Sequence, residues 1–346
     1  MGLFSKTIRT LGPWGGYQLA RQICRNQPRI LMYHRFSNPP VKDWASPKYF
    51  EQQVRHIKEN YNSYSLVGLM QYKREHGHMP RHAVVITVDD GYRDFYHYAY
   101  PILRKYQVPA TLFVTTGFVD RKLWLWPDKI TWLLNQVDRI PETIKIGAFC
   151  SGSGPVNFET RPFYWQQWIT HSLSLPDPEK HSFIDQLASK LGKVFPLSIP
   201  HEFEPVTWGE LLEMQDNEIE IGGHTVTHPS LGRVTESQAR EEIFGCRDTL
   251  NERLGDRYRT FCYPNGQPSD FRAFLPGLVQ EAGFLGAVTA FPDAYGTRDP
   301  LLMRRHVSGD DMFQFFKSVS GVELVGLRLR KDVRMSLSGV VASYAG

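Results

Sequence analysis

The amino-acid sequence predicts an α/β fold built around a largely parallel β-sheet, and two observations lead to this prediction. Short apolar runs alternate with longer segments of helical periodicity along most of the 346 residues. This alternation is typical of strand–helix–strand units joined by right-handed crossovers. The best of these runs, VVITV at 84–88, is apolar on both faces, as expected for a strand covered by helices on each side. The pattern fits an open sheet as well as a barrel.

The first part of the chain sets up this alternation. Strands are predicted at 29–34, 84–88 and 109–116, and helices at 49–61 and 92–106. Ser46 and Pro47 stand before the first of these helices, where a cap and a proline in the first turn favour helix initiation.

The alternation resumes after residue 205. Helices are predicted at 208–215 and 236–254, and strands at 218–224, 259–264 and 286–290. Thr207 with Glu210, and Thr235 with Gln238, have the spacing of capping boxes that open the two helices.

Residues 121–205 break the rhythm and predict an insertion into the fold. Segments rich in Trp, Pro and Gly at 124–128, 151–155 and 163–168 are expected to be loops, and helices are predicted at 129–137 and 181–195. Loops of this kind in parallel α/β folds gather at the C-terminal ends of the strands, where ligands bind.

Composition and charge exclude several classes of protein. Forty basic and 36 acidic residues give a net charge of +4, which is too mild a balance to predict nucleic-acid binding. The four cysteines form no CxxC pair, so neither a disulfide framework nor a zinc ribbon is expected.

The two ends of the chain are basic. Residues 1–28 form a basic leader without the apolar run of a signal peptide, and residues 321–346 form a basic tail. No segment approaches the roughly 20 apolar residues that span a bilayer. The leader and the tail either pack on the domain or lie on a membrane surface. A cytoplasmic location, with peripheral contact at the inner membrane face as the alternative, is the resulting expectation.

Two adjacent carboxylates, Asp89 and Asp90, follow the strand at 84–88. Their charges repel each other at the strand end, so each needs a partner. Either they cap the next helix, where carboxylates are favoured, or one ligates a metal while its neighbour stays ionised as a base.

A second cluster of candidate ligands lies in GGHTVTHPSL, residues 222–231. His224 and His228 are four residues apart, so one helical turn would put both imidazoles on one face, about 6 Å apart at Cβ. A single histidine is usually a satisfied polar residue, but two beside an unpartnered carboxylate pair favour a metal. Two imidazoles and one carboxylate are a common catalytic zinc set, so a divalent cation, with Zn²⁺ preferred, is predicted.

Together with PATLFV at 109–114, these motifs resemble the polysaccharide deacetylase family, the NodB-homology or carbohydrate esterase family 4 domain. The resemblance runs from Arg29 to Asp311 and is interrupted by the insertion. It implies a distorted (β/α)7-type barrel over 29–320 with a mostly helical insertion. It also implies a metal-dependent hydrolase that removes N-acetyl or O-acetyl groups from an acetylated sugar polymer or glycan precursor.

The resemblance assigns roles residue by residue. It makes Asp89 the general base and makes Asp90, His224 and His228 the metal ligands. In the family's third motif, matched here by FCYPNG at 261–266, it assigns Tyr263 to the position that stabilises the oxyanion.

One departure from the family concerns the arginine that orients the catalytic aspartate. Cys262 stands in its place, and Arg304 in the last predicted strand is expected to supply the missing charge. For the neighbouring Arg305, a position facing the surface is the alternative to one facing the site. His306 is expected to be the general acid that protonates the leaving amine, although no carboxylate partner for it is evident in the sequence.

Two further residues have alternative roles. His34 at the end of the first strand either contacts substrate or is a hydrogen-bonded histidine at the barrel rim. Trp126, with Trp124, either stacks on a sugar ring or fills the core of the insertion.

Two other functions compete with the deacetylase. The missing motif arginine favours a barrel that has lost catalysis and only binds carbohydrate, whereas the intact carboxylates and histidines favour an enzyme. A glycoside hydrolase needs two acids flanking one bond, but adjacent residues of a strand point to opposite sides.

Overall fold

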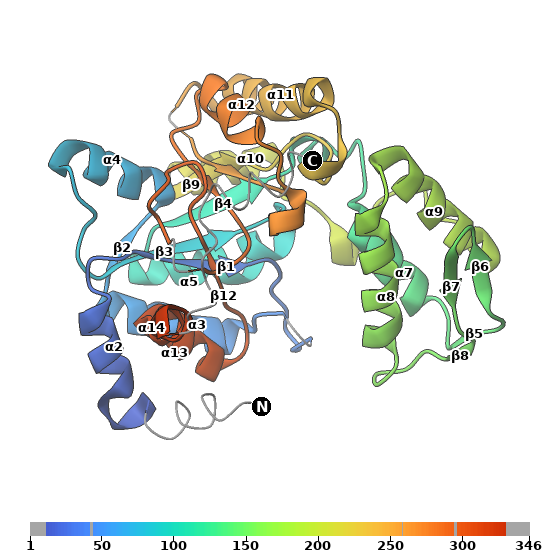
Figure 1. Cartoon of the computed structure of the whole chain (residues 1–346), viewed down its shortest axis with the longest axis horizontal. Helices are drawn as coiled ribbons and strands as arrows, with labels where there is room; N and C mark the ends of the chain where they lie inside the picture. The colour runs from blue at the N-terminus through green and yellow to red at the C-terminus, as the bar shows by residue number, and fades with distance from the viewer. Residues whose placement is uncertain (1–11, 42–43, 258, 294–295, 330–346) are drawn as a thin grey trace.

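The computed structural model describes residues 12–41, 44–257, 259–293 and 296–329. Its centre is an eight-stranded sheet in the order β11-β10-β9-β4-β3-β1-β12, with β2 beside β3, and all neighbouring strands are parallel. The strands are β1 Arg29–Tyr33, β2 Asn62–Tyr64, β3 Ala83–Val88, β4 Ala110–Val114, β9 Ile219–Gly223, β10 Phe261–Cys262, β11 Ala287–Val288 and β12 His306–Val307. Figure 1 shows this curled sheet with helices packed around it, and the predicted fold class is therefore confirmed.

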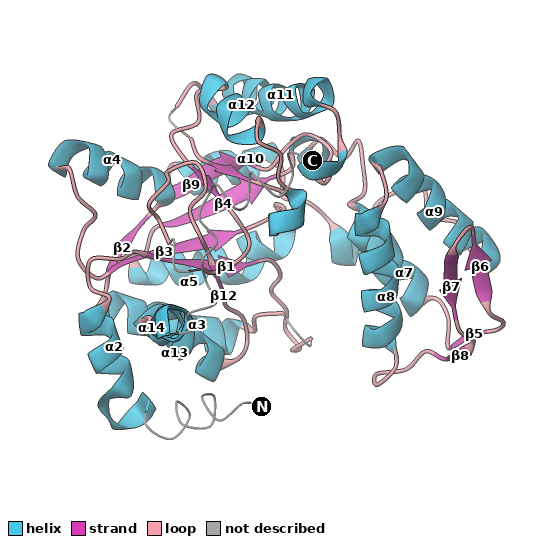
Figure 2. Cartoon of the chain, in the orientation of Figure 1, coloured by secondary structure: helices cyan, strands magenta, loops and turns pink. Residues whose placement is uncertain are grey.

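Helices cover the outside of the sheet (Figure 2). They are α2 Tyr17–Ile23, α3 Pro47–Asn60, α4 Leu66–His76, α5 Tyr100–Tyr106, α6 Thr116–Val119, α10 Trp208–Gln215, α11 Glu236–Leu254, α12 Leu275–Glu281, α13 Met312–Ser320 and α14 Val322–Leu329. Both capping boxes are present, since the side chains of Thr207 and Thr235 each accept a backbone hydrogen bond at the start of α10 and α11. The strand β2 and the helices α2, α4, α6, α12, α13 and α14 were not predicted from the sequence.

The helix predicted at 92–106 begins with a π-helical turn, Phe95–Ala99, before α5. Pro101 lies at the second position of α5 and has no N–H to donate to the carbonyl of His97. The regular hydrogen-bond ladder is therefore interrupted at this point.

The register of the parallel strands brings their C-terminal ends to one edge of the sheet. Tyr33 of β1 pairs with Val88 of β3, and Val114 of β4 pairs with Gly223 of β9. The residues that follow β1, β3 and β9 therefore lie together at this edge. The strand interiors are almost fully buried, because helices cover one face and side chains of the barrel interior fill the other.

The insertion forms a lobe, defined here as residues 126–190, beside the barrel (Figure 1). It contains α7 Trp126–Asn135, α8 Arg161–Ser174, α9 Asp177–Lys190 and two small antiparallel pairs formed by β5 Arg139–Ile140, β6 Ile144–Ile146, β7 Phe149–Ser151 and β8 Gly154–Pro155. Its apolar side chains form a hydrophobic cluster separate from those of the barrel.

Two expectations about the insertion are corrected by this lobe. The segment 163–168, predicted as a loop, lies inside α8, because Pro162 is tolerated in the first turn of a helix and Tyr164 and Trp168 are buried on its inner face. The segment 124–128, also predicted as a loop, contains the start of α7.

The described part of the basic leader packs on the barrel. Helix α2 contacts α13 and α14, and the ring of Tyr17 stacks on Phe316 with centroids 5.3 Å apart. Residues 1–11 and 330–346, which hold most of the predicted basic ends, lie outside the described residues. Within the described residues, no helix has the length and apolar character needed to cross a bilayer.

Candidate active site

Three potential metal ligands converge at the C-terminal edge of the sheet. Asp90 Oδ1 lies 3.4 Å from His224 Nε2 and 3.3 Å from His228 Nε2. All three side chains are buried, and their ligand atoms are close enough to share one ion. The structure thus brings together the three residues that the sequence predicted as ligands.

The backbone that carries these ligands is unusual. Residues 224–230 form an irregular loop with a bend at 226–227 rather than the predicted helical turn, and both Thr225 and His228 have positive φ, at 67° and 61°. Asp90 also has a positive φ, at 77°. Positive φ is costly for residues other than glycine, and it persists where the surrounding structure requires it, which is often at a functional site. Here it turns both imidazoles toward Asp90, with ring centroids 4.9 Å apart.

The chemistry of the donor set fits a cation. His224 Nδ1 lies 2.7 Å from the carbonyl oxygen of Cys262, and because a carbonyl only accepts, Nδ1 must carry the proton. In the neutral imidazole, Nε2 then presents a lone pair to Asp90, which also only accepts. A divalent cation between these atoms removes this conflict, and the hydrogen bond to a carbonyl is the usual way to orient a metal-binding histidine.

Asp90 is ionised in this environment. Burial raises the pKa of its carboxyl, but His224 and His228, in their protonated form, donate to the carboxylate and hold its pKa well below the ordinary value. An ionised carboxylate is the form that binds a cation.

Asp89, beside this set, forms a buried ion pair with Arg305. Arg305 donates from Nη1 to Oδ1 at 2.6 Å and from Nη2 to Oδ2 at 2.7 Å. Burial raises the pKa of Asp89, but the charge and hydrogen bonds of Arg305 outweigh it and lower the pKa below its ordinary value. Asp89 is therefore a carboxylate in a defined orientation.

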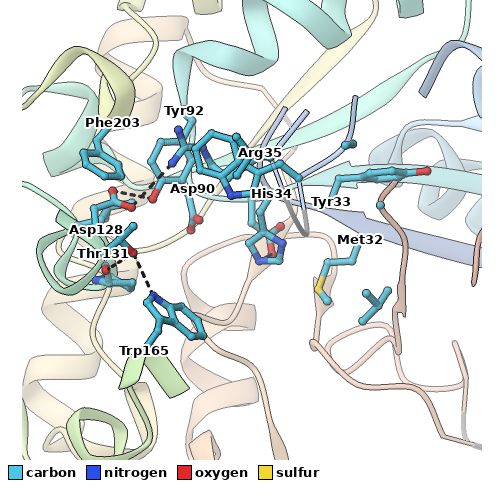
Figure 3. A pocket seen from close by; sticks show the side chains of 18 of the residues that line it. Met32, Tyr33, His34, Arg35, Asp90, Tyr92, Asp128, Thr131, Trp165 and Phe203 are labelled. Carbon is cyan, nitrogen blue, oxygen red and sulfur yellow. Dashed lines mark hydrogen bonds and ion pairs between the residues drawn. The ribbon is translucent and has the colours of Figure 1, made fainter. Parts of the chain in front are cut away.

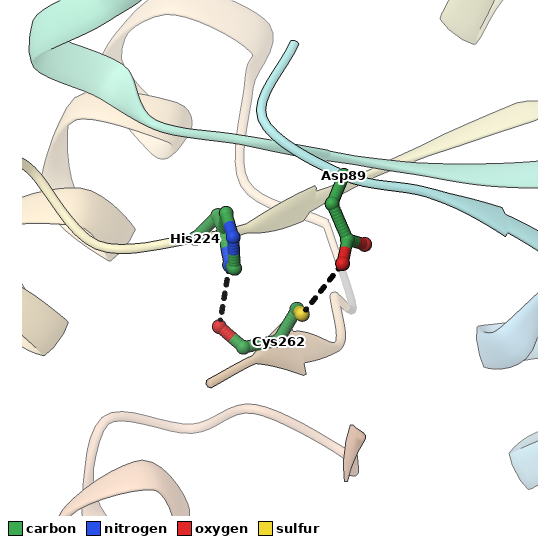
Figure 4. A group of neighbouring side chains, drawn as sticks. All are labelled: Asp89, His224 and Cys262. Carbon is green, nitrogen blue, oxygen red and sulfur yellow. Dashed lines mark hydrogen bonds between the residues drawn. The ribbon is translucent and has the colours of Figure 1, made fainter. Parts of the chain in front are cut away.

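Cys262 lies against this ion pair. Its Sγ is 3.1 Å from Arg305 Nη2 and 3.5 Å from Asp89 Oδ2. Figure 4 shows Asp89, His224 and Cys262 as a second group of potential ligands. This group is a poor metal site, because Arg305 already neutralises Asp89 and the near nitrogen of His224 is bonded to the Cys262 carbonyl.

The sequence predicted the wrong arginine. Arg304 pairs with the buried Asp293 at 2.9 Å and does not reach Asp89. Side chains alternate along an extended segment, so Arg305 points into the barrel while Arg304 and His306 point outward. The alternative in which Arg305 faces the surface is also excluded, since its side chain is 1% exposed.

The same alternation corrects the assignment of His306. Its Nδ1 lies 2.7 Å from Glu323 Oε2 on α14, outside the barrel, and it is not among the residues that line the pocket described next. His306 has a carboxylate partner that the sequence did not reveal, but this pair does not face Asp89 and His306 cannot act there as the general acid.

A pocket of about 920 Å³ opens over Asp89 and Asp90. The barrel side of its wall includes His34, Tyr263, Asn265 and Arg305. His34 follows β1, its side chain is 47% exposed, and its Nε2 lies 3.6 Å from Asp89 Oδ2.

The prediction that Tyr263 stabilises an oxyanion through its backbone N–H is contradicted. That N–H donates to the carbonyl of Val288 at 3.2 Å, in the pairing of β10 with β11. Asn265, two residues later, has a positive φ of 58°. Its Nδ2 is buried and has no hydrogen-bond partner among the described residues. It is a donor in the pocket that the sequence reasoning missed, although it follows the motif's proline directly.

The lobe forms the other side of the pocket (Figure 3). Asp128 on α7 accepts a hydrogen bond from the Tyr92 hydroxyl at 2.8 Å and lies 3.9 Å from Arg35 Nη1. Burial raises the pKa of Asp128 to about 7, although Arg35 and Tyr92 act in the opposite direction. The guanidinium of Arg35 lies over the rings of Trp44 and Tyr92, 3.9 and 3.8 Å from their centroids.

Trp126 does not line this pocket. It is 2% exposed, belongs to the hydrophobic cluster of the lobe, and has Lys180 Nζ 5.0 Å from its ring centroid. Of its two predicted alternatives, the structure contradicts stacking on a sugar and supports a role in the lobe core. The lobe tryptophan that lines the pocket is Trp165 on α8.

Comparison with known proteins gives a consistent family match. Residues 76–153 and 156–275, more than half of the chain, match the family model described as polysaccharide deacetylase. A stretch of 93 residues is 34% identical to the poly-beta-1,6-N-acetyl-D-glucosamine N-deacetylase of Staphylococcus aureus and covers 27% of this chain and 32% of that protein. A protein of the same name from Staphylococcus epidermidis is 29% identical over 111 residues, covering 28% of this chain and 38% of that protein. The chain thus spans about a third of the length of these relatives.

Solved structures share the fold at low sequence identity. The deacetylase PplD of Streptococcus pyogenes, in complex with acetate, is 19% identical with a TM-score of 0.53, over 86% of this chain and 97% of that chain. IcaB from Ammonifex degensii is 17% identical with a TM-score of 0.53, over the same shares of 86% and 97%. A de-N-acetylase from Aggregatibacter actinomycetemcomitans is 15% identical with a TM-score of 0.54, over 85% and 99%.

Proposed function

The chain belongs to the polysaccharide deacetylase family, and on this premise we propose that it hydrolyses N-acetyl groups of an acetylated sugar polymer or glycan precursor. One observation carries the proposal: two adjacent carboxylates at one pocket have separate partners. Asp90 faces two imidazoles, and Asp89 faces a buried arginine. This division supplies one ligand and one base from consecutive residues.

The proposed cofactor is a divalent cation, with Zn²⁺ as the preferred ion, held by Asp90, His224 and His228. Such a cation lowers the pKa of water toward neutrality and polarises the amide carbonyl. Three protein ligands leave room for water and substrate, as in catalytic rather than structural zinc sites.

Asp89 is the proposed general base. It lies at the pocket, it is ionised, and Arg305 fixes both of its oxygens. A base in this position accepts the proton of the attacking water, which contributes on the order of 10²–10⁴-fold to the rate. Arg305 orients this carboxylate, which is the task of the motif arginine that Cys262 replaces.

His34 and Asn265 are proposed to act on the leaving group and on the carbonyl oxygen. His34 is the pocket histidine that remains once His224 and His228 are assigned to the metal, and its exposed imidazole can give a proton to the leaving amine. The amide Nδ2 of Asn265 is a buried donor without a partner, which suits it to a carbonyl oxygen that gains negative charge.

The alternative of a barrel that only binds carbohydrate loses its main argument here. It rested on the missing motif arginine, whereas Arg305, directly before β12, reaches the same aspartate from another part of the barrel. The proposal therefore keeps an enzymatic function.

Acetate release tests this function. The substrates are β-1,6-linked N-acetylglucosamine oligomers, chosen from the names of the Staphylococcus relatives, with an O-acetylated glycan alongside. Release that stops on chelation and returns with Zn²⁺ supports the proposal. A lack of release from every acetylated glycan, by protein with a full complement of metal, contradicts it.

A further inference from the structure

The lobe presents one face of each of two helices to the pocket. On α7, Asp128, Thr131 and Asn135 line the pocket at i, i+3 and i+7. On α8, Arg161 and Trp165 line it at i and i+4. Residues at these spacings share one side of a helix. The lobe's own core is built mainly by other residues of the two helices, such as Ile130, Leu133 and Trp168.

Trp165 is held in place on this face. Its indole Nε1 donates to Thr131 Oγ1 at 3.0 Å, and that hydroxyl donates to the carbonyl of Pro127 at 3.1 Å. The side chain is half-buried, with one part against the lobe core and another at the pocket. Figure 3 shows Trp165 beside Thr131 and Asp128, on the other side of the view from His34 and Met32. A fixed aromatic ring loses little conformational entropy when a ligand stacks on it.

A polar group without a partner accompanies this ring. The Nε atom of Arg161, one helical turn before Trp165, is buried and has no hydrogen-bond partner among the described residues. A buried donor left unpaired is costly, and a ligand hydroxyl would satisfy it. An aromatic face beside a free donor matches a sugar ring, which has an apolar C–H face and a rim of hydroxyls.

The size of the pocket allows for this second ligand group. Its 920 Å³ lies near the upper end of the roughly 300–1,000 Å³ typical of ligand pockets. When one acetylated sugar is bound at Asp89 and Asp90, the part of the pocket next to the lobe is still empty and can hold another sugar unit.

We propose that the pocket face of α7 and α8 is a second sugar subsite, in which Trp165 stacks on a sugar unit next to the one that is deacetylated and Arg161 donates to its hydroxyls. The inference rests on the proposed function for the identity of the first sugar. The substrate is then a glycan of at least two sugar units, and the lobe is the part of the protein that selects for this length.

The test compares Trp165→Ala with Trp132→Ala. Trp132 is also a partly buried tryptophan of the lobe that packs against the same core, but it does not line the pocket. Binding of a β-1,6-linked N-acetylglucosamine pentamer is measured by calorimetry in the Asp89→Asn background. Acetate release is measured with the pentamer and with 4-nitrophenyl acetate.

The expected result is about a tenfold weaker pentamer Kd and about a tenfold lower kcat/KM in Trp165→Ala, with ester hydrolysis within about twofold of the parent, from the size of aromatic contacts. Trp132→Ala should leave pentamer binding unchanged. Thr131→Val keeps the ring but removes its hydrogen bond, and should weaken pentamer binding by about two- to fivefold. This variant serves if Trp165→Ala does not fold.

Unchanged pentamer affinity in folded Trp165→Ala or Thr131→Val, or equal weakening in Trp165→Ala and Trp132→Ala, overturns the subsite. Absence of acetate release by the parent enzyme contradicts the proposed function instead, and the binding measurement still decides the subsite.

Discussion

Replacing Arg305 by methionine should damage both stability and turnover. Arg305 donates to both oxygens of Asp89 and also to the Thr289 carbonyl at 2.8 Å and the Thr87 hydroxyl at 3.1 Å. Methionine removes these four hydrogen bonds, together with the one to Cys262 Sγ, and leaves Asp89, itself 3% exposed, as a buried carboxylate without its counter-ion.

The magnitude follows from the burial of the pair. Removing one partner of a buried ion pair typically costs about 3–5 kcal/mol. An unfolding entropy of about 2.1 cal/mol/K per residue gives about 0.7 kcal/mol per kelvin for this chain. The melting temperature should therefore fall by roughly 4–7 °C. Because the base loses its orientation and burial now disfavours its ionised form, kcat should fall by about 10²-fold.

The neighbouring arginine offers a matched control. Arg304 is equally buried and also forms an ion pair, with Asp293, but on the outer side of the segment. Arg304→Met should lower the melting temperature by a comparable amount and leave kcat close to that of the parent at 20 °C. Calorimetry, acetate release and bound-metal content are measured on both variants.

Full turnover in a folded Arg305→Met protein would refute the assignment of Arg305 as the positioning residue for Asp89. So would an equal fall in kcat in Arg304→Met, because the loss would then follow from stability alone.

Three further predictions concern single residues of the site. His224→Ala, His228→Ala and Asp90→Ala should each lose bound metal, and near-stoichiometric zinc in any of them would contradict the ligand set. Asp89→Asn should retain metal but lose turnover on the order of 10²–10⁴-fold. If Asp89→Asn lost its metal while Asp90→Asn kept it, Asp89 would be the metal ligand and Asp90 the general base. Burial raises the pKa of Asp128 from 3.8 to about 7. As the pH rises, the carboxyl therefore loses its proton in the unfolded chain before it does so in the folded protein. The free energy of unfolding should fall by about 4 kcal/mol between pH 4 and 7. Asp128→Asn should lack this loss, so urea unfolding should find it more stable than the parent at pH 8 but not at pH 4.5; an equal difference at both pH values would contradict the buried neutral carboxyl.

Local patterns in the sequence determined most strands of the barrel and the candidate metal ligands. The β-branched run at 84–88 and the paired carboxylates after it need no distant information, because a buried strand is apolar throughout and its end is where polar groups appear. The spacing of His224 and His228 identified both as candidate ligands, and the structure places them together at Asp90 even though the segment between them is not helical.

Tertiary structure alone decided which residues surround these ligands. Arg304, Arg305 and His306 are adjacent, and a shift of one residue in an extended segment reverses inside and outside, so only the pairing of β12 with β1 places Arg305 in the barrel. Trp126 and Trp165 are both aromatic residues of the insertion, and only the packing of α7 on α8 puts one in the core and the other at the pocket. The amino-acid sequence cannot distinguish the roles of residues of the same type in one segment, because these roles depend on contacts with segments far away in the chain.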